Sequence, residues 1–166
     1  MGNVIKKVVL YMATTVDGFI AGPNDEAEWV SENSWNSYIE FVKSCDVALV
    51  GKKTALLMPE NEFLLDTKYF IATGSKTRIN ANFENISIQS AADLPDVDKI
   101  GIIGGGNFNG NMATLDLINE IILDIEPLTL GNGIRLFGDH NPKLNLKLLS
   151  SKKFTNGTVQ NHYKVV

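Results

Sequence analysis

Cysteine and histidine are scarce in this chain. Cys45 is the single cysteine among 166 residues, and the two histidines are His140 and His162. One cysteine excludes an intramolecular disulfide and a cysteine-based zinc cluster. Neither histidine has a metal-ligating neighbour at helical or loop spacing, so we expect no metal site. His162 belongs to an alternating strand pattern that predicts a solvent-facing side chain.

Other features are missing as well. No apolar run reaches the roughly 18 residues that a membrane span requires. The first residues contain no apolar core followed by a small-residue cleavage site, as a secretory signal would. Lysine and arginine number 15 against 19 acidic residues, a net charge of −4, and no basic stripe favours nucleic-acid binding. We therefore expect a cytoplasmic protein that binds neither membranes nor nucleic acid.

The remaining composition is that of an ordinary globular protein. Hydrophobic residues make up 44% of the chain, and its length fits a single domain covering residues 1–166. Short apolar runs predict strands over 4–13, 46–50, 68–73, 86–88, 99–103, 120–126, 144–149 and 158–166. Helical patterns predict helices over 34–44, from 51 to 59, at 91–94 and over 109–118, and 14–25 is expected to be a loop.

The order of these elements predicts an α/β fold. Strands alternate with helices until residue 126, which is typical of a mixed, mainly parallel central sheet with helices on both faces. Residues 120–126 are nearly all apolar, which places that strand in the interior of the sheet. The dipeptide Asn156-Gly157 separates the last two strands, and this is the strongest short-range hairpin signal. We therefore expect a C-terminal antiparallel hairpin.

The most informative motif is a run of three glycines, Gly104, Gly105 and Gly106, at the end of an apolar strand. Backbone N–H groups at such a strand end, next to a helix N-terminus, can bind a phosphate. Asn109 stands where the dinucleotide-binding fingerprint has its last glycine, so that motif is not met. Asp124 lies twenty residues beyond Gly104, at the spacing of a ribose-binding acid. A tight turn without a ligand is the alternative interpretation.

Three more loops follow expected strands. They begin at Thr14, Gly51 and Thr73, and in an open α/β sheet the carboxyl ends of parallel strands line one ligand-binding edge. Hydroxyl and basic side chains in these loops suit phosphate groups. These candidates are Thr15, Lys52, Lys53, Thr54, Thr73, Ser75 and Lys76.

Acidic side chains near aromatic residues form a second group of candidates. Asp17 follows the first strand and precedes a glycine. Its carboxylate could bind the N–H groups of an amino-pyrimidine ring, or it could cap its own turn. Glu26 and Glu28 lie beside Trp29, and such a pair can orient a flat heterocycle. An exposed loop is the alternative for these residues.

Five segments in order resemble the dihydrofolate-reductase-like superfamily, and within it the C-terminal reductase domain of the riboflavin-biosynthesis deaminase–reductase. The segments are TTVDGFIA at 14–21, VGKKT at 50–54, IGGG at 103–106, LINEI at 117–121 and PLTLGNGIRLF at 127–137. Together they span nearly the whole chain. The deaminase half of that protein, with its zinc ligands, has no counterpart in this sequence.

The resemblance implies an NADPH-dependent reductase. It implies that Gly51 to Thr54 and Gly104 to Gly106 hold the cofactor phosphates, and that Thr73, Ser75 and Lys76 face the adenosine 2′-phosphate. It places Asp17 on the substrate side, and implies that the loop with Leu130, Gly131 and Gly133 closes the pocket. Two positions depart from the family pattern: Lys52 replaces an arginine, and Asn119 stands where an aspartate is frequent.

The sequence leads to one principal functional hypothesis. It is an NADPH-dependent reductase of a pyrimidine- or pteridine-type heterocycle, with Asp17 and Glu28 as candidate catalytic acids and Trp29, Leu130 and Gly131 near the substrate. The resemblance to this family also implies a homodimer whose interface is formed by the hydrophobic C-terminal strands. A dihydrofolate reductase would need an acid on the first helix, a role open to Glu28 only if that helix begins before Ser34. A non-catalytic nucleotide-binding or regulatory module of the same fold is the third possibility.

Overall fold

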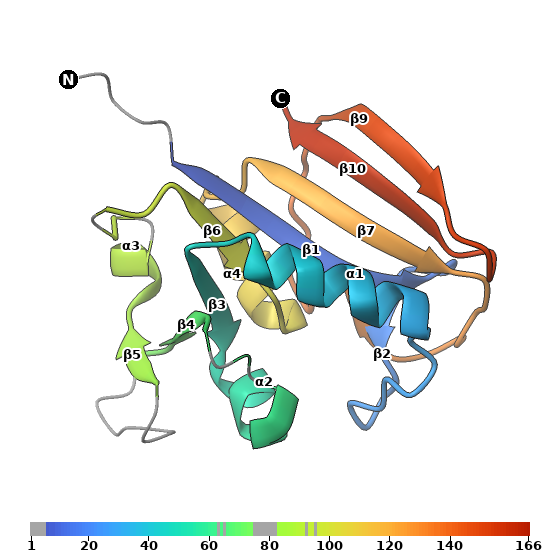
Figure 1. The fold of residues 1–166 in the computed structure, drawn as a ribbon, viewed down its shortest axis with the longest axis horizontal. Helices are drawn as coiled ribbons and strands as arrows, with labels where there is room; N and C mark the ends of the chain where they lie inside the picture. The colour runs from blue at the N-terminus through green and yellow to red at the C-terminus, as the bar shows by residue number, and fades with distance from the viewer. Residues whose placement is uncertain (1–5, 63, 65, 75–82, 92, 95) are drawn as a thin grey trace.

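The computed structural model describes residues 6–62, 64, 66–74, 83–91, 93, 94 and 96–166. Strands and helices alternate up to residue 126 (Figure 1). The helices are α1 (Glu32–Lys43), α2 (Lys52–Leu57), α3 (Ile88–Ala91) and α4 (Gly106–Thr114), with a 3-10 turn at Glu60–Glu62. The strands are β1 (Lys7–Thr15), β2 (Phe19–Ala21), β3 (Val47–Gly51), β4 (Lys68–Ala72), β5 (Glu84–Ile86), β6 (Lys99–Ile102), β7 (Glu120–Glu126), β8 (Ile134–Arg135), β9 (Leu146–Lys153) and β10 (Val159–Val165).

Eight of these strands form one sheet in the order β5-β4-β3-β6-β1-β7-β10-β9. The first six are parallel to one another, and β10 pairs antiparallel with both β7 and β9. The expected fold class is confirmed, including the C-terminal hairpin and the interior position of β7. Because β1, β3, β4 and β6 run in the same direction, the loops that follow them meet at one edge.

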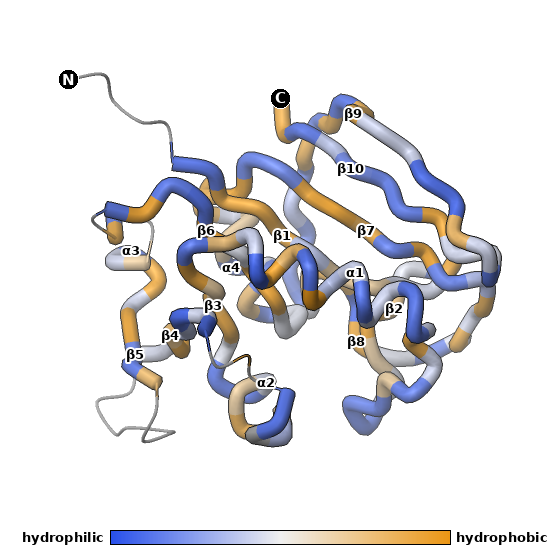
Figure 2. The backbone as a smooth tube through the Cα atoms, viewed as in Figure 1, coloured by the Kyte–Doolittle hydropathy of each residue, from blue (hydrophilic) through white to orange (hydrophobic). Residues whose placement is uncertain are grey.

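Helices cover both faces of the parallel part of the sheet. On one face, Phe108 and Met112 of α4 pack against Leu10 and Leu49 of the sheet. On the other face, Phe41 of α1 belongs to a second buried cluster with side chains from β1 and β3. Figure 2 shows hydrophobic backbone running through β1, β3, β6 and β7. Strands buried on both sides need apolar residues at every position, which explains the continuous runs in the sequence.

Several boundaries differ from the expected ones for local reasons. The α1 helix begins at Glu32, because the Ser31 hydroxyl accepts a hydrogen bond from the Ser34 backbone N–H and caps it. The Ser87 hydroxyl accepts a hydrogen bond from the Ser90 backbone N–H in the same way. Residue 88 therefore starts α3 and does not extend β5. The α4 helix covers 106–114 in place of 109–118, because the last glycine of the motif is already helical.

The first and last strands also depart from expectation. The β1 strand extends to Thr15, whereas residues 4 and 5 of its expected span lie outside the described residues. The short strand β2 lies within the expected loop 14–25 and pairs antiparallel with β8. The β9 strand starts two residues later than expected and continues to Lys153, because its pairing with β10 through Val159 carries the ladder to that point.

The sequence predicts that His162 faces solvent, and its side chain is 30% exposed, but it also contacts an acidic side chain of the neighbouring strand. Its Nε2 lies 2.6 Å from Glu120 Oε2, and Lys7 Nζ lies 2.9 Å from Glu120 Oε1. The three residues come from adjacent strands β10, β7 and β1, so sheet pairing brings them together. Burial acts to raise the pKa of Glu120, but the hydrogen bonds from Lys7 and His162 outweigh it and hold this pKa below its usual range.

This ion pair predicts a pH-dependent stability difference. A folded-state pKa below the unfolded one, about 4.3, stabilises the protein above that pH, and the contribution is lost as the pH falls through the folded pKa. The variant Lys7→Met should therefore lose less than about 1 kcal/mol at neutral pH, because Lys7 is half exposed. The loss should shrink as the pH falls through the folded-state pKa of Glu120 and vanish below it. Urea unfolding at several pH values measures it.

Lys43→Met is the matched control, since its partner Glu40 is exposed. It should change the free energy of unfolding by about 0.5 kcal/mol or less at every pH. A difference for Lys7→Met that stays constant or grows on acidification would contradict the assignment to Glu120.

Candidate active site

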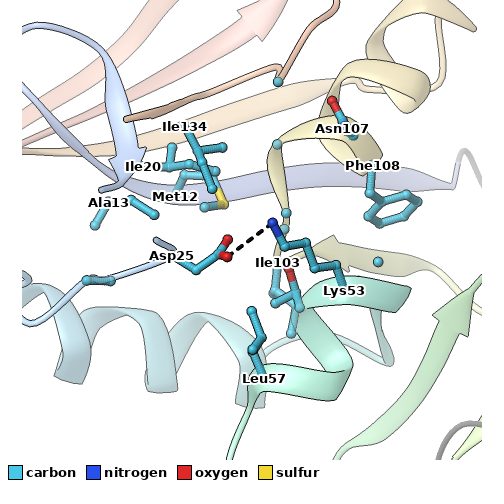
Figure 3. Close-up of a pocket in the computed structure, with 18 of the residues that line it drawn as sticks. Met12, Ala13, Ile20, Asp25, Lys53, Leu57, Ile103, Asn107, Phe108 and Ile134 are labelled. Carbon is cyan, nitrogen blue, oxygen red and sulfur yellow. Dashed lines mark ion pairs between the residues drawn. The ribbon is translucent and has the colours of Figure 1, made fainter. Parts of the chain in front are cut away.

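A cavity of about 1290 Å³ opens at the carboxyl edge of the parallel strands. Residues from the ends of β1, β3 and β6 line it, together with α1, α2, the start of α4 and the segment around β8. Figure 3 shows Met12, Ile20 and Ile134 on one side and Ile103 with Leu57 on the other. Its size and mixed apolar and polar wall are typical of a site for a cofactor together with a second small molecule.

The glycine motif and the loop after β3 meet at this cavity. The Gly51 backbone N–H donates to the Gly104 carbonyl at 2.7 Å, which joins the two strand ends. Gly105 is the N-cap of α4, and no side chain caps that helix. Its first N–H groups are therefore free of side-chain competition, the arrangement that binds phosphates. A Cβ on Gly105 would lie 2.7 Å from the Thr54 hydroxyl, so any side chain in this cradle would displace Thr54.

The next glycine serves a packing role. A Cβ on Gly106 would lie 2.7 Å from the Arg135 carbonyl oxygen and 3.0 Å from the Gly138 nitrogen. The segment around β8 therefore packs directly on the backbone of α4, and its residues Arg135 and Asp139 join the cavity wall. The Asn109 amide reinforces this contact by donating to the Leu136 carbonyl at 3.0 Å.

Two lysines of α2 supply positive charge at the cavity. Lys52 and Lys53 both line it, and Lys53 Nζ lies 3.1 Å from Asp25 Oδ2. Figure 3 shows this ion pair reaching from α2 to the β2–α1 loop across the opening. The sequence analysis did not single out Asp25. Its exposed lysine partner remains accessible to an anionic ligand, because surface ion pairs of this kind are weak.

Aromatic residues of α1 line the opposite part of the wall. Trp35 and Tyr38 lie one turn apart, with ring centroids 5.3 Å from each other, and Tyr38 lies 5.8 Å from Tyr11 of β1. All three line the cavity, as does Glu28. Burial raises the pKa of Tyr38, so its hydroxyl stays protonated. Rings at such spacing offer a flat heterocycle a stacking surface.

Two buried acids lie behind this aromatic wall. Asp124 is fully buried, and Glu126 is 1% exposed. The hydroxyl of Tyr11 and the amide of Gln160 donate to Asp124, whose pKa burial raises. Glu126 has the opposite shift, because hydrogen bonds, chiefly from the hydroxyls of Thr158 and Ser31, outweigh the effect of burial and lower its pKa. Asp124 does not line the cavity, so it is no ribose-binding acid in this arrangement.

The structure brings most predicted phosphate-binding residues together. The predicted residues that line the cavity are Glu28, Gly51, Lys52, Lys53, Thr54, Gly104, Gly105, Gly106 and Gly133. Those that do not line it are Thr15, Asp17, Trp29, Thr73, Leu130 and Gly131. Ser75 and Lys76 lie outside the described residues. Sequence spacing therefore located the glycine and lysine loops, and the wall formed by Tyr11, Trp35 and Tyr38 was missed. The only sequence signal for that wall is the i, i+3 spacing of Trp35 and Tyr38, which equally predicts a core-facing helix.

Asp17 has a structural role that the sequence left open. Its Oδ1 accepts from the Thr15 hydroxyl at 2.6 Å, and its two oxygens accept from the backbone N–H groups of Leu130 and Gly131 at 3.2 and 2.8 Å. The Thr15 hydrogen bond, with those from the loop, lowers the pKa of Asp17. The carboxylate thus ties the β1–β2 turn to the loop after β7. Its predicted contact with a substrate stays a prediction.

Glu28 and Trp29 precede α1. Glu28 is exposed and lies in the loop before the helix, so the early start of α1 at Glu32 does not place it on the helix. The Trp29 indole N–H is buried and finds no acceptor within the described part of the chain. Among the same residues no three His, Cys, Asp or Glu side chains gather as a metal ion would require. No helix in the described ranges is long and apolar enough to cross a membrane.

Known proteins provide an independent comparison. Residues 90–160 match the family model of the RibD C-terminal domain. The chain is 29% identical to the uncharacterized protein YyaP of Bacillus subtilis, with 93% of each chain covered. A protein of Shewanella sp. PV-4 assigned to riboflavin biosynthesis has the same fold, with a TM-score of 0.82 at 20% identity, covering 96% of this chain and 99% of that one.

A larger protein contains the same fold as one part. The diaminohydroxyphosphoribosylaminopyrimidine deaminase/5-amino-6-(5-phosphoribosylamino)uracil reductase of Thermotoga maritima aligns with a TM-score of 0.78 at 16% identity. The alignment covers 98% of this chain and 57% of the Thermotoga protein. The resemblance found in the sequence is thereby confirmed: residues 90–160 match the RibD C-terminal domain model, and the chain has the dihydrofolate-reductase-like fold of these structures.

Proposed function

We propose that this protein is an NADPH-dependent reductase of a pyrimidine- or pteridine-type heterocycle. The observation that carries the proposal is the meeting of two kinds of wall in one cavity. Gly104 to Gly106 and the lysines of α2 form a wall suited to phosphates, and Trp35 with Tyr38 forms a wall suited to a flat ring. A reductase must hold a dinucleotide and an oxidised substrate side by side.

The residues present fit the cofactor's phosphates. The uncapped N-terminus of α4 offers backbone N–H donors, and the Gly105 cradle would be filled by any side chain. Lys52 and Lys53 add two cations, and Thr54 adds a hydroxyl at the same end. When bound, a reduced nicotinamide supplies a hydride. The chain's own residues orient the substrate and exclude water, and they need no nucleophile for this chemistry.

The aromatic wall selects the substrate class. Tyr11, Trp35 and Tyr38 present ring faces and edges, and Glu28 offers a carboxylate to ring N–H groups. An aminopyrimidine such as the uracil derivative named for the Thermotoga protein combines a flat ring, N–H donors and a phosphate group. Arg135, which also lines the cavity, supplies a cation for such a phosphate.

Cofactor oxidation tests the function directly. We expect the purified protein to bind NADPH, as measured by its fluorescence, and to oxidise it in the presence of 5-amino-6-(5-phosphoribosylamino)uracil or a related pyrimidine. Turnover with dihydrofolate alone would identify a dihydrofolate reductase. Tight NADPH binding without turnover of any pyrimidine or pteridine would favour a non-catalytic nucleotide-binding module. Absence of NADPH binding would refute the proposal.

A second prediction concerns the choice between NADPH and NADH. Thr73 directly follows β4. The next residues of the sequence include Ser75, Lys76 and Arg78, which lie outside the described residues. A 2′-phosphate requires hydroxyl donors and cations of this kind. The double variant Lys76→Ala/Arg78→Ala should lose about 1–3 kcal/mol of NADPH binding free energy and leave NADH binding nearly unchanged. Titrations at low and high salt check it, since exposed charges are screened.

Equal losses for the two cofactors would contradict the assignment of these residues to the 2′-phosphate. The double variant Lys43→Ala/Lys68→Ala is the control, because both lysines are exposed and neither lines the cavity. It removes the same net charge and should leave both affinities within about twofold of the parent, an effect of the size expected for distant surface charges.

The homodimer is part of the same proposal. All eight residues of β9 are exposed, among them Leu146, Leu148 and Leu149, which are 42–52% exposed. In Figure 1 this strand forms the outer edge of the sheet beside β10. Three exposed leucines on an edge strand would promote aggregation of a monomer, whereas a dimer could bury them at its interface. Sedimentation equilibrium is expected to give twice the mass of the chain, and a monomer would refute it.

A further inference from the structure

The charged side chains that line the cavity are divided between its two walls. Lys52 and Lys53 begin α2 directly after Gly51, which is hydrogen-bonded to the glycine motif. Arg135 packs against the same motif through its carbonyl group, and Asp139 follows in the same segment. Among the described residues these three are the cations that line the cavity, so its positive charge lies on the phosphate side.

The aromatic side of the cavity carries negative charge. Glu28 lies just before α1, the helix that supplies Trp35 and Tyr38, and Glu62 ends the 3-10 turn that follows α2. Both acids line the cavity. Burial raises the pKa of Tyr38, and electrostatic interactions with Tyr69 and Glu62 raise it further, so the field of Glu62 reaches this ring.

Neither of these two acids is neutralised by a cation. Asp25, which also lines the cavity, is paired with Lys53 at 3.1 Å, and Figure 3 shows this pair at the opening. Within the described part of the chain, Glu28 and Glu62 form no ion pair. Glu28 is exposed and Glu62 is partly buried. A cleft whose wall carries one sign of charge concentrates ligands of the opposite sign.

The two rings of α1 form a corner that suits a flat cation. The planes of Trp35 and Tyr38 are inclined at 35°, with their centroids 5.3 Å apart, and we call this pair the aromatic corner. Trp35 is 36% exposed, so a ligand in the cavity reaches it. Aromatic faces attract cations, and the attraction grows where the cation is shielded from water. A cation at this corner meets aromatic faces together with the carboxylates of Glu28 and Glu62.

We propose that the aromatic corner, with Glu28 and Glu62, binds the substrate as a cationic heterocycle whose C=N bond is protonated or alkylated at nitrogen. The proposal rests on the proposed reductase function and narrows its substrate class. A neutral ring gains only stacking at this corner, whereas a cationic ring also gains the attraction of two carboxylates. The charge of the ring therefore selects the substrate, in addition to its shape.

A cationic C=N bond also suits hydride transfer. The hydride forms a C–H bond at the ring carbon, and the π electrons of the C=N bond become the lone pair of the nitrogen. The reductant is the reduced nicotinamide, which is oxidised in this step. The protein supplies no proton, and the ring becomes neutral. The product thereby loses its attraction to Glu28 and Glu62, which favours its release.

The first test compares the binding of two ligands that differ in charge. N-methylquinolinium is a permanent cation, and lepidine is a methylquinoline of nearly the same size that is uncharged at slightly alkaline pH. Isothermal titration calorimetry of the full chain without cofactor measures both Kd values. We expect the cation to bind at least about tenfold more tightly, because a shielded cation–π contact contributes free energy of that size. Equal Kd values, tighter binding of lepidine or no detectable binding of the cation would each overturn the proposal, whatever the protein reduces.

Variants assign this preference to the aromatic corner. Glu28→Gln/Glu62→Gln should weaken the binding of N-methylquinolinium by about tenfold and leave the Kd of lepidine within about twofold of the parent. Trp35→Leu should weaken the binding of both ligands. The control Glu32→Gln/Glu40→Gln removes the same charge from exposed positions of α1 that do not line the cavity, and it should leave both Kd values within about twofold. Circular dichroism checks that each variant folds, and a parent-like preference in Glu28→Gln/Glu62→Gln would overturn the proposal.

The oxidised nicotinamide is itself a cationic ring and is therefore the competing occupant of the corner. Titration of the same double variant with NADP+ tests this alternative. We expect its Kd for NADP+ to stay within about twofold of the parent, as for charges at a distance from the ligand. A loss as large as that for N-methylquinolinium would assign the corner to the cofactor and overturn the proposal.

Turnover with NADPH separates this proposal from the reductase function. We expect the parent to reduce an N-methylated pteridinium with a lower KM than the corresponding neutral pteridine. Glu28→Gln/Glu62→Gln should raise the KM of the cation by about tenfold and keep kcat within about threefold. An unchanged KM of the cation in that variant would overturn the proposal and leave the reductase function intact. A parent protein that oxidises no NADPH with any heterocycle would refute the reductase function, and calorimetry would still decide whether the aromatic corner binds a cation.

Discussion

Gly105→Asp should abolish NADPH binding and leave the fold intact. Gly105 is the N-cap of α4 with extended backbone angles, and aspartate is a favourable N-cap residue. The helix should therefore form once the Thr54 side chain, whose hydroxyl lies 2.7 Å from the new Cβ, has moved aside. The carboxylate of the new aspartate would accept hydrogen bonds from the first N–H groups of α4 and place a negative charge where the pyrophosphate is expected. We expect the Kd for NADPH to rise by at least about 100-fold, or ~2.7 kcal/mol, in a fluorescence titration.

Gly105→Ala separates charge from bulk. Its Cβ would approach the Thr54 hydroxyl at 2.7 Å, so Thr54 must shift, but no charge is added. We expect alanine to weaken binding by about tenfold, or ~1.4 kcal/mol, clearly less than aspartate. If Gly105→Asp folds, as judged by circular dichroism, and binds NADPH as tightly as the parent, the phosphate-binding role of the glycine motif is wrong.

Glu126→Leu should cause the largest loss of stability. The Glu126 carboxylate is 1% exposed and accepts three hydrogen bonds: from the Ser31 N–H at 2.9 Å, from the Ser31 hydroxyl at 2.7 Å and from the Thr158 hydroxyl at 2.6 Å. Ser31 is also the N-cap of α1. Leucine would leave the fully buried Thr158 hydroxyl and the two partly buried donors of Ser31 without this acceptor, which costs about 3 kcal/mol or more. Urea unfolding followed by tryptophan fluorescence measures the change.

Two further variants make this result interpretable. Glu126→Gln keeps one carbonyl acceptor for Ser31, so it should cost about 1–2 kcal/mol. Glu40→Gln changes an acid of α1, the helix that Ser31 caps. The Glu40 side chain is 75% exposed, so this change should cost about 0.5 kcal/mol or less. Equal stability of Glu126→Leu and the parent would show that Ser31 and Thr158 find other partners.

The sequence alone determined the fold class and one wall of the cavity. The spacing of apolar residues predicted which face of each strand and helix is buried. It did so because each face of the sheet is covered and requires apolar residues at regular positions. The Asn156-Gly157 turn located the hairpin, since its backbone preferences are local. The glycine motif and the lysines of α2 were found together for a topological reason: parallel strands bring their following loops to one edge whatever the side chains are.

The tertiary structure alone decided which polar groups pair. Asp17 could bind a ring or a turn, and the nearness of Leu130 and Gly131, 113 and 114 residues away, directs it to the loop after β7. Tyr11 and Asp124 stand in strands whose patterns are almost wholly apolar, 113 residues apart, so no local spacing reveals their contact. Asp25 and Lys53 meet only because α2 and the β2–α1 loop border the same opening. Periodicity tells which face of a strand is buried, but the partner of a buried polar side chain depends on strand order and helix position, which three-dimensional packing sets.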